Sequence, residues 1–198
     1  MHCDILKIKK KIRSSLDIDR YEHTLGVAYM CIALSMKYGY DLEKAEIAGL
    51  LHDCAKRYDV DTIISKSAKY NISVTEGELA APGILHAKLG AFMAMHKFHV
   101  EDQEIISAIL LHTTGKPAMS LPEQILFVAD YIEPRRDKAP NLTKIRKIAF
   151  EDLDKATYLI MKDKLSYLKK QDTTIAEITV KAYQYYYEKT CGEVLNEK

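Results

Sequence analysis

The chain has 198 residues, with 29 lysines and arginines against 28 aspartates and glutamates, so its formal net charge is +1. This length is sufficient for one domain with a sizeable core, and the balanced charge argues against the basic surfaces that bind nucleic acid or anionic membranes. The four cysteines (Cys3, Cys31, Cys54 and Cys191) form no CxxC pair and no stretch of about 18 uncharged apolar residues occurs, so we expect a cytoplasmic protein with reduced thiols.

Apolar residues recur at helical spacing along the chain, and no segment alternates long enough to predict a strand. Asp4, Asp41 and Asp59 (or Asp61) stand where helix N-caps are expected, and Gly39 is placed as a C-terminal signal. The pattern predicts an all-α bundle of about eight helices. The helical segments, in chain order, are 4–16, 19–38, 41–52, 59–71, 82–98, 102–112, 121–132, 142–170 and 174–190.

Several histidines and aspartates stand beside apolar helical runs, where unpaired polar groups cost several kcal/mol to bury. A single histidine in such a place is more often a hydrogen-bonded core residue than a ligand. Six groups of this kind at separate places favour another explanation, because one shared cation would satisfy all of them. These groups are His23, His52, Asp53, His86, His112 and Asp130. We assign no function to His2, His96 and His99.

The chemistry of these groups predicts a divalent-metal site. Imidazole and carboxylate together suit iron, manganese, cobalt, nickel or zinc, and the absence of thiolates from these motifs argues against a closed structural zinc site. The expected ligands are His23, His52, Asp53 and Asp130, which leave two vacancies in an octahedral shell. If the helix continues through the His-Asp doublet, Lys56 lies on the same face and is placed to bind a phosphate.

The order of these motifs resembles the HD-domain metal-dependent phosphohydrolases. In particular, RYEHTLGVAYM, AGLLHDCAK, LLHTTG and VADYIEP are similar to the YqeK family of bacterial symmetrical diadenosine tetraphosphate hydrolases, from Arg20 to about Asp154. The resemblance implies a single HD domain over residues 1–198, with a motif core at 20–154 and C-terminal helices at 155–198. It also implies cleavage of diadenosine tetraphosphate into two ADP at iron or a similar divalent metal, with manganese, cobalt and nickel as alternatives.

The resemblance assigns His23, His52, Asp53 and Asp130 to the metal, with Asp53 also catalytic and Asp130 also near the substrate. His86 and His112 match further motif positions. They either hold a second metal or contact the phosphate chain and protonate a leaving oxygen; we favour the second role, with one firmly held metal.

The remaining expected substrate-binding groups are basic residues and a loop. Arg20, Lys56 and Arg136 are expected to bind phosphate oxygens. Thr113, Thr114 and Gly115 are expected to offer hydroxyl and backbone N–H groups. Arg135 replaces the glycine of the usual EPGR pattern, and it is either solvated or narrows the site.

The tyrosines of AYQYYYEK (Tyr183, Tyr185, Tyr186 and Tyr187) are interpreted mainly as packing for the last helix, and adenine stacking is the alternative. The expected ligand is a dinucleoside polyphosphate or a nucleoside diphosphate, and a homodimer is possible. Alternative functions are an HD-domain nucleotidase or alarmone phosphohydrolase, a di-iron oxygenase, and a noncatalytic nucleotide sensor.

Overall fold

The computed structural model describes residues 4–192, and every regular element in that range is helical. The all-α prediction is therefore confirmed. His2 and Cys3 lie outside the described residues. The elements are α1 (Ile5–Arg13), α2 (Ile18–Tyr38), α3 (Leu42–Leu51), α4 (Val60–Lys69), α5 (Glu76–Leu79), η1 (Pro82–Ile84), α6 (Leu85–Phe98), α7 (Gln103–Leu111), α8 (Leu121–Ile132), α9 (Leu142–Ala149), α10 (Leu153–Lys170) and α11 (Glu177–Cys191). No helix in residues 4–192 combines the length and apolarity needed to cross a bilayer.

Aspartate side chains begin many of these helices, as the sequence predicts. Asp4, Asp41 and Asp59 each accept a hydrogen bond from the backbone N–H three residues later, which satisfies a donor that the first helical turn leaves free. At the other end of α2, Gly39 has φ +74°, a left-handed conformation that glycine adopts without steric cost. Local chemistry thus sets most of the helix boundaries.

The structure departs from the predicted pattern at three places. The 142–170 segment is broken after Ala149, because Asp152 caps a new helix by accepting from the Lys155 N–H. The short helix α5 was not predicted; a capping box between Thr75 and Glu78 supports it. The third difference bears on function: α3 ends at Leu51, and residues 52–57 form consecutive turns.

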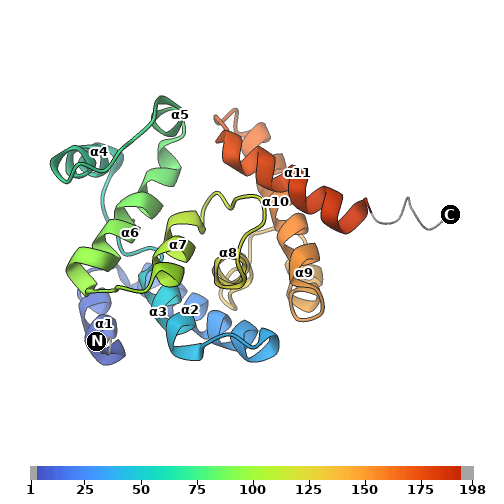
Figure 1. The fold of residues 1–198 in the computed structure, drawn as a ribbon, viewed down its shortest axis with the longest axis horizontal. Coiled ribbons are helices and arrows are strands. Elements are labelled where there is room, and N and C mark those ends of the chain that lie inside the picture. The colour runs from blue at the N-terminus through green and yellow to red at the C-terminus, as the bar shows by residue number, and fades with distance from the viewer. Residues whose placement is uncertain (1–3, 193–198) are drawn as a thin grey trace.

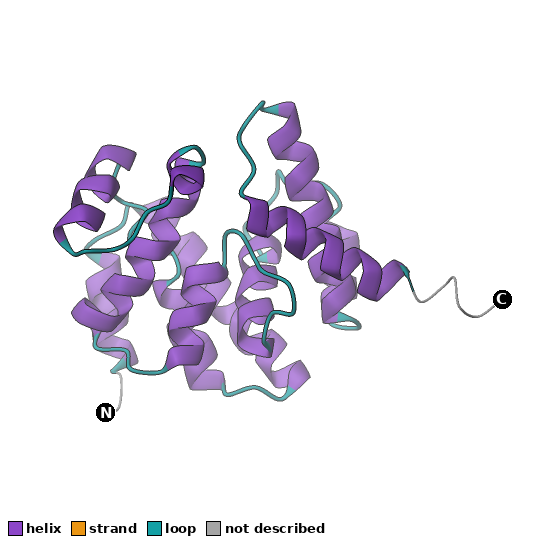
Figure 2. Ribbon diagram, turned by 45° about the horizontal axis from the view of Figure 1, so that its top comes forward, coloured by secondary structure: helices purple, strands orange, loops and turns teal. Residues whose placement is uncertain are grey.

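Helix α8 lies at the centre of the bundle, between the helices at the N-terminal side and the group α9, α10 and α11 (Figures 1 and 2). It is apolar nearly all round, and Phe127, Val128, Ala129 and Ile132 have no exposed surface. A helix with this pattern must be covered on all sides, and α2, α3, α7, α9 and α10 all contact it. The placement of α8 brings Asp130 toward α2 and α3.

The C-terminal tyrosines pack α11 against its neighbours. Tyr186 is 1% exposed, and its hydroxyl oxygen accepts a hydrogen bond from the Met119 N–H at 3.0 Å. Tyr183 and Tyr187 have their ring centroids 5.8 Å from that of Tyr158 on α10. None of the four predicted tyrosines lines the large cleft described below, so the packing interpretation agrees with the structure and adenine stacking at these rings has no support.

Candidate metal centre and substrate cleft

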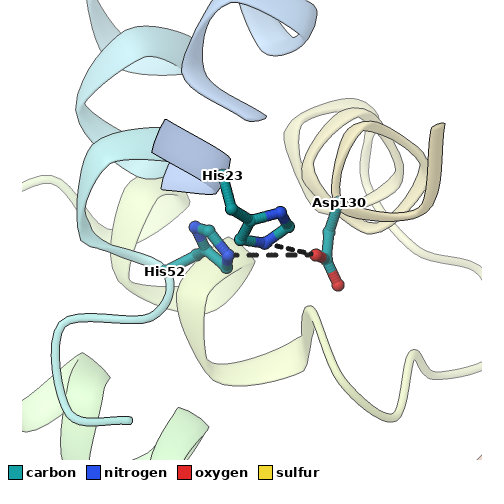
Figure 3. A group of neighbouring side chains, drawn as sticks. All are labelled: His23, His52 and Asp130. Carbon is teal, nitrogen blue, oxygen red and sulfur yellow. Dashed lines mark ion pairs between the residues drawn. The ribbon is translucent and has the colours of Figure 1, made fainter. Parts of the chain in front are cut away.

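Six side chains from five helical elements meet at one point of the bundle. His23 comes from the second turn of α2, His86 from the start of α6 and Asp130 from the end of α8. His52 and His112 are the C-cap residues of α3 and α7, and Asp53 follows His52 in the turn. Figure 3 shows His23, His52 and Asp130 pointing toward one another. The sequence therefore identified the six groups that the fold brings together.

The His-Asp doublet does not lie on a continuous helix, which corrects the predicted geometry. Asp53 and Lys56 nevertheless remain neighbours, because the turn is held by a hydrogen bond from the Lys56 N–H to the Asp53 carbonyl oxygen. The Lys56 ammonium reaches Asp53 Oδ2 at 3.2 Å. The predicted proximity is thus correct, although turns and not a helix produce it.

Each of the four histidines of the centre has a polar contact at Nδ1 that orients its ring, so that Nε2 faces the centre. In His52, His86 and His112, Nδ1 lies 2.7 to 2.8 Å from the carbonyl oxygen three residues earlier. A carbonyl can only accept, so Nδ1 carries the proton and Nε2 of the neutral ring presents a lone pair. His23 differs, because its Nδ1 lies 3.1 Å from the Glu133 carboxylate. Such support is typical of metal-binding histidines.

Several acceptor atoms face one another at the centre, and donors reach it only at its edge, from Thr113, Lys56 and Arg20. His86 Nε2 and His112 Nε2 are 3.2 Å apart, and they lie 3.3 and 3.6 Å from Asp53 Oδ1. Among the described residues, His52 Nε2 and Asp53 Oδ1 are buried without a hydrogen-bond donor, and Asp53 Oδ2 meets only the Lys56 and Arg20 cations. Converging lone pairs of this kind are stable only around a cation, so the residues fit a divalent metal.

Two overlapping sets have the spacing of a metal site: His23, His52 and Asp130, and His52, Asp53 and His112. In each set the candidate ligand atoms all lie within 4.8 Å of one another. The two sets share His52 and together include all four predicted ligands. They also add His112, which the sequence placed at the phosphate chain or at a second metal.

Burial and neighbouring charges shift the pKa values of these groups toward the protonation states in which they can bind a metal. Burial lowers the pKa of His52 to about 4 and also lowers the pKa of His86, so both rings are neutral at pH 7. Burial opposes ionisation of Asp53 and Asp130, but their cationic and histidine neighbours outweigh it and hold both pKa values well below the usual range. Neutral imidazoles and ionised carboxylates are the ligand forms that metals require.

His23 behaves differently from the other histidines. Burial acts to lower its pKa, but the hydrogen bond with Asp130 and the contact with Glu133 outweigh burial and raise its pKa above the usual value. A proton on Nε2 therefore links His23 to Asp130 Oδ1, at 3.2 Å. A metal bound between these two residues must displace that proton.

We predict that binding of Mn²⁺ at pH 6 releases protons, mainly from His23, because its raised pKa keeps that ring protonated at this pH. Because the pKa of His23 is raised, protons compete with the metal near neutral pH, and the apparent metal affinity rises as pH rises through that pKa. Calorimetric titrations in buffers with different ionisation enthalpies measure the proton count. Equal binding enthalpies in all buffers would contradict this assignment.

The centre opens into a cleft of about 960 Å³, with Asp53, His86, His112 and Asp130 among its lining residues. Three predicted phosphate-binding cations also line it. Arg20 Nη1 lies 3.6 Å from Asp53 Oδ2. Arg136 Nη2 donates hydrogen bonds to the backbone carbonyl oxygen of Asp130 and to its carboxylate Oδ1. With Lys56, these residues place three positive charges beside the two metal-facing carboxylates.

The threonine loop contributes less than predicted. Thr113 lines the cleft, and its hydroxyl lies 3.2 Å from His112 Nε2. Thr114 is buried and does not line the cleft, and the Gly115 N–H is bonded to the Leu111 carbonyl oxygen. The geometry thus gives no support to phosphate binding by Thr114 or Gly115. Arg135 does not line the cleft either; it pairs with Glu22 at 2.7 Å, so it does not narrow the site.

Glu133 and Lys164 are among the cleft residues that sequence reasoning missed. Glu133 holds His23 Nδ1 and is 2% exposed. Gly26 leaves room for it, since a Cβ at Gly26 would lie 2.5 Å from Glu133 Oε2. Lys164 of α10 is half-buried in the cleft wall. The motif VADYIEP gave a signal for Glu133, whereas Lys164 stands in a lysine-rich amphipathic helix without any signal.

A helical bundle that gathers histidines and aspartates from several helices around a metal-ready centre defines the HD class of proteins. The profile of the family described as "HD domain" matches residues 20–135 of this chain.

Within that class, the chain is 35% identical to a symmetrical bis(5'-nucleosyl)-tetraphosphatase of Halalkalibacterium halodurans, over 89% of this chain and 94% of the relative. It is 34% identical to the enzyme of the same name from Bacillus subtilis, over 88% and 92% of the two chains. The chain belongs to this family of HD-domain hydrolases.

The fold is shared with a solved structure. A crystal structure from Clostridium acetobutylicum, described as a predicted HD superfamily hydrolase involved in NAD metabolism, matches with a TM-score of 0.90 and 33% sequence identity. The match covers 94% of this chain and 98% of that chain. The arrangement of α1 to α11 is therefore a known one.

Proposed function

We propose that this protein is a divalent-metal-dependent hydrolase that cleaves diadenosine tetraphosphate symmetrically into two ADP. The names of the relatives from H. halodurans and B. subtilis support this substrate and this position of cleavage. The observation that carries the proposal is the convergence of buried histidine and aspartate acceptors, of which Asp53, His86 and His112 line a cleft together with Arg20, Lys56 and Arg136. A metal centre next to cations suits a polyphosphate.

In this proposal, His23, His52, Asp53 and Asp130 hold one divalent metal. Iron is our first choice, with manganese, cobalt or nickel as alternatives, since imidazole and carboxylate ligands suit all four. When bound, the metal supplies a Lewis acid for phosphate oxygens and a means of deprotonating water near neutral pH. A second ion at His52, Asp53 and His112 is the alternative that metal analysis distinguishes.

The side chains around the centre orient the phosphate chain. Lys56, Arg20 and Arg136 bind nonbridging oxygens, and Thr113 donates its hydroxyl. These cations pair with Asp53 and Asp130, so a metal that takes over the two carboxylates would free the cations for an anionic substrate. Because the protein would hold the substrate by its phosphates, the central phosphoanhydride bond can be placed at the metal.

His86 and His112 contact the phosphates at the point of cleavage. Because Nδ1 of each ring is committed to a backbone carbonyl, only Nε2 can exchange a proton with the substrate. Protonation of a leaving oxygen therefore requires the imidazolium form, which burial disfavours in His86. The second pKa of a phosphate group is about 6, so at pH 7 a nucleoside diphosphate can leave as the anion, without a proton from a histidine.

Residues 1–198 would act as a single HD domain, with the motif core at 20–154 and the helices of 155–198 completing the cleft. Helix α10 contributes to the cleft wall, which supports a role for the C-terminal helices in completing the cleft. We also propose that the protein works in the cytoplasm, and the free thiols of Cys31, Cys54 and Cys191 support a reducing compartment.

Incubation of the metal-reconstituted protein with diadenosine tetraphosphate tests the function directly. Chromatography is expected to resolve ADP as the sole nucleotide product, with two ADP formed per substrate consumed. AMP and ATP in equal amounts would reject symmetrical cleavage. Binding without turnover in iron, manganese, cobalt and nickel would replace the hydrolase with a nucleotide sensor, and oxygen consumption with a polyol would indicate an oxygenase.

A further inference from the structure

One wall of the cleft lies beyond the segment that matches the HD-domain profile. The profile ends at residue 135, whereas the lining of the cleft continues with Asp137–Pro140 and with Asp163, Lys164 and Tyr167 of α10. This α10 wall faces the same space as Asp53, His86 and Asp130. A volume of about 960 Å³ stands at the upper end of the roughly 300–1,000 Å³ usual for small-molecule sites, so the cleft has room for more than one nucleotide.

Lys164 brings an unpaired positive charge into this wall. Its Nζ donates to the Thr113 carbonyl oxygen at 3.2 Å, one residue from His112, and lies 4.4 Å from the ring centroid of Phe127. Among residues 4–192, no carboxylate lies within ion-pair distance of this ammonium. A lysine has three N–H donors, and Thr113 uses only one. Burial lowers the pKa of Lys164 to about 8, although the negative charge of Asp130 acts to raise it.

Tyr167 lies one helical turn further along α10 and presents an aromatic surface. Its side chain lines the cleft and is 62% exposed. The ring and hydroxyl have no hydrogen bond or ring contact within the described residues. An exposed aromatic face beside a cation is the combination that binds a nucleotide, with stacking for the base and charge for the phosphate.

The carboxylates of the α10 wall have hydrogen-bond partners or a lysine neighbour of their own. Asp163 accepts hydrogen bonds from the Tyr131 hydroxyl at 3.2 Å and from the Asn141 side-chain amide at 3.1 Å, and these neutral donors fix the direction of its carboxylate. Asp137 is exposed, and its neighbour Lys138 is also exposed and lines the cleft. The Lys164 ammonium, by contrast, is half-buried and bonded to the residue that follows His112.

We infer that the α10 wall is the subsite for the second nucleotide, where Lys164 binds the departing diphosphate and Tyr167 stacks on its base. This inference rests on the proposed function. In the reaction, a water oxygen bonds to a central phosphorus as the bond from that phosphorus to the central bridging oxygen breaks. The bond's electron pair stays on the bridging oxygen, which leaves with the second ADP beside Lys164, and the proton of the water passes to solvent.

Kinetics with two substrates separate the roles of these residues. Adenosine 5'-tetraphosphate carries the same four phosphates but lacks the second adenosine. Tyr167→Ala is expected to raise KM about tenfold for diadenosine tetraphosphate, the size of one base–aromatic stack, and to leave KM for adenosine tetraphosphate unchanged. Lys164→Met is expected to lower kcat/KM for both substrates by about tenfold or more, as the loss of one phosphate contact requires. The exposed Lys162→Met on the same helix is the matched control and is expected to behave as wild type.

Calorimetry with ADP tests the subsite without turnover. The metal-reconstituted wild type is expected to bind two ADP per chain, and the Lys164→Met/Tyr167→Ala double variant only one. One ADP per chain in the wild type, or equal kinetic losses in Lys162→Met, would overturn the subsite even if diadenosine tetraphosphate is cleaved to ADP. Two ADP sites in a protein that does not cleave the dinucleotide would instead refute the proposed function and leave the subsite standing.

Discussion

Asp53→Ala protein is expected to lose its divalent metal and at least about a thousandfold of its hydrolase activity, while it keeps the helical content of the wild type. A metal contributes several kcal/mol to phosphoryl chemistry, and each 1.4 kcal/mol or so is a factor of ten in rate. Asp53 is 1% exposed, and its carboxylate contacts the metal-facing histidines and the cleft cations Lys56 and Arg20, so its removal takes away groups of the site and no hydrogen bond between helices. His52→Ala is expected to give the same result.

Elemental analysis of the purified variants, ADP release and circular dichroism provide the three measurements. The exposed His96→Ala is a matched control, because it removes an imidazole from α6 that does not line the large cleft. It should retain metal and activity. Stoichiometric metal together with full activity in Asp53→Ala would remove the proposed mechanism.

Gly49→Ala is expected to lower stability by about 1–3 kcal/mol, the usual cost of overpacking a tight contact. A Cβ at Gly49 would lie 2.6 Å from the Ala28 Cα and 2.9 Å from its backbone nitrogen. Ala28 has no exposed surface, so neither α2 nor α3 can move aside without disturbing the core. Because these helices carry His23 and lead into His52, metal affinity should also fall.

Thermal unfolding followed by circular dichroism measures this effect, and for a chain of this size each 1 kcal/mol shifts Tm by roughly 2–4 °C. Gly77→Ala serves as the control, because no atom lies within 4 Å of the added Cβ. It should be neutral or slightly stabilising, since alanine is the better residue inside a helix. An unchanged Tm for Gly49→Ala would show that the α2–α3 contact is less rigid than its geometry requires.

Local features of the sequence predicted the helices well where their signals lie within a few residues. Asp4, Asp41 and Asp59 each act as an N-cap through a hydrogen bond to the third residue along, so the boundary is encoded beside the helix it begins. The same reasoning failed after Leu51, because an apolar run ending in His52 and Asp53 does not tell whether the chain continues as a helix or as turns.

The sequence was sufficient to predict which histidines and aspartates form the candidate site. His52 and Asp53 stand out because buried imidazole and carboxylate groups need a partner, and the order of the motifs indicated the others. Lys164 could not be found in this way. Its position depends on a hydrogen bond to Thr113, 51 residues away, and on the ring of Phe127 beneath it.

By itself, the sequence determined an all-α protein of the HD class and the six histidines and aspartates of its centre. Helix periodicity, capping and the chemistry of isolated polar groups depend on residues close together in the chain, so they can be read from it. Only the tertiary structure decided that Glu133 supports His23 across 110 residues, that Thr114 and Arg135 stand outside the cleft, and that α10 closes one wall. Those features arise from the packing of α2, α8 and α10, and side chains that meet across helices leave no local pattern.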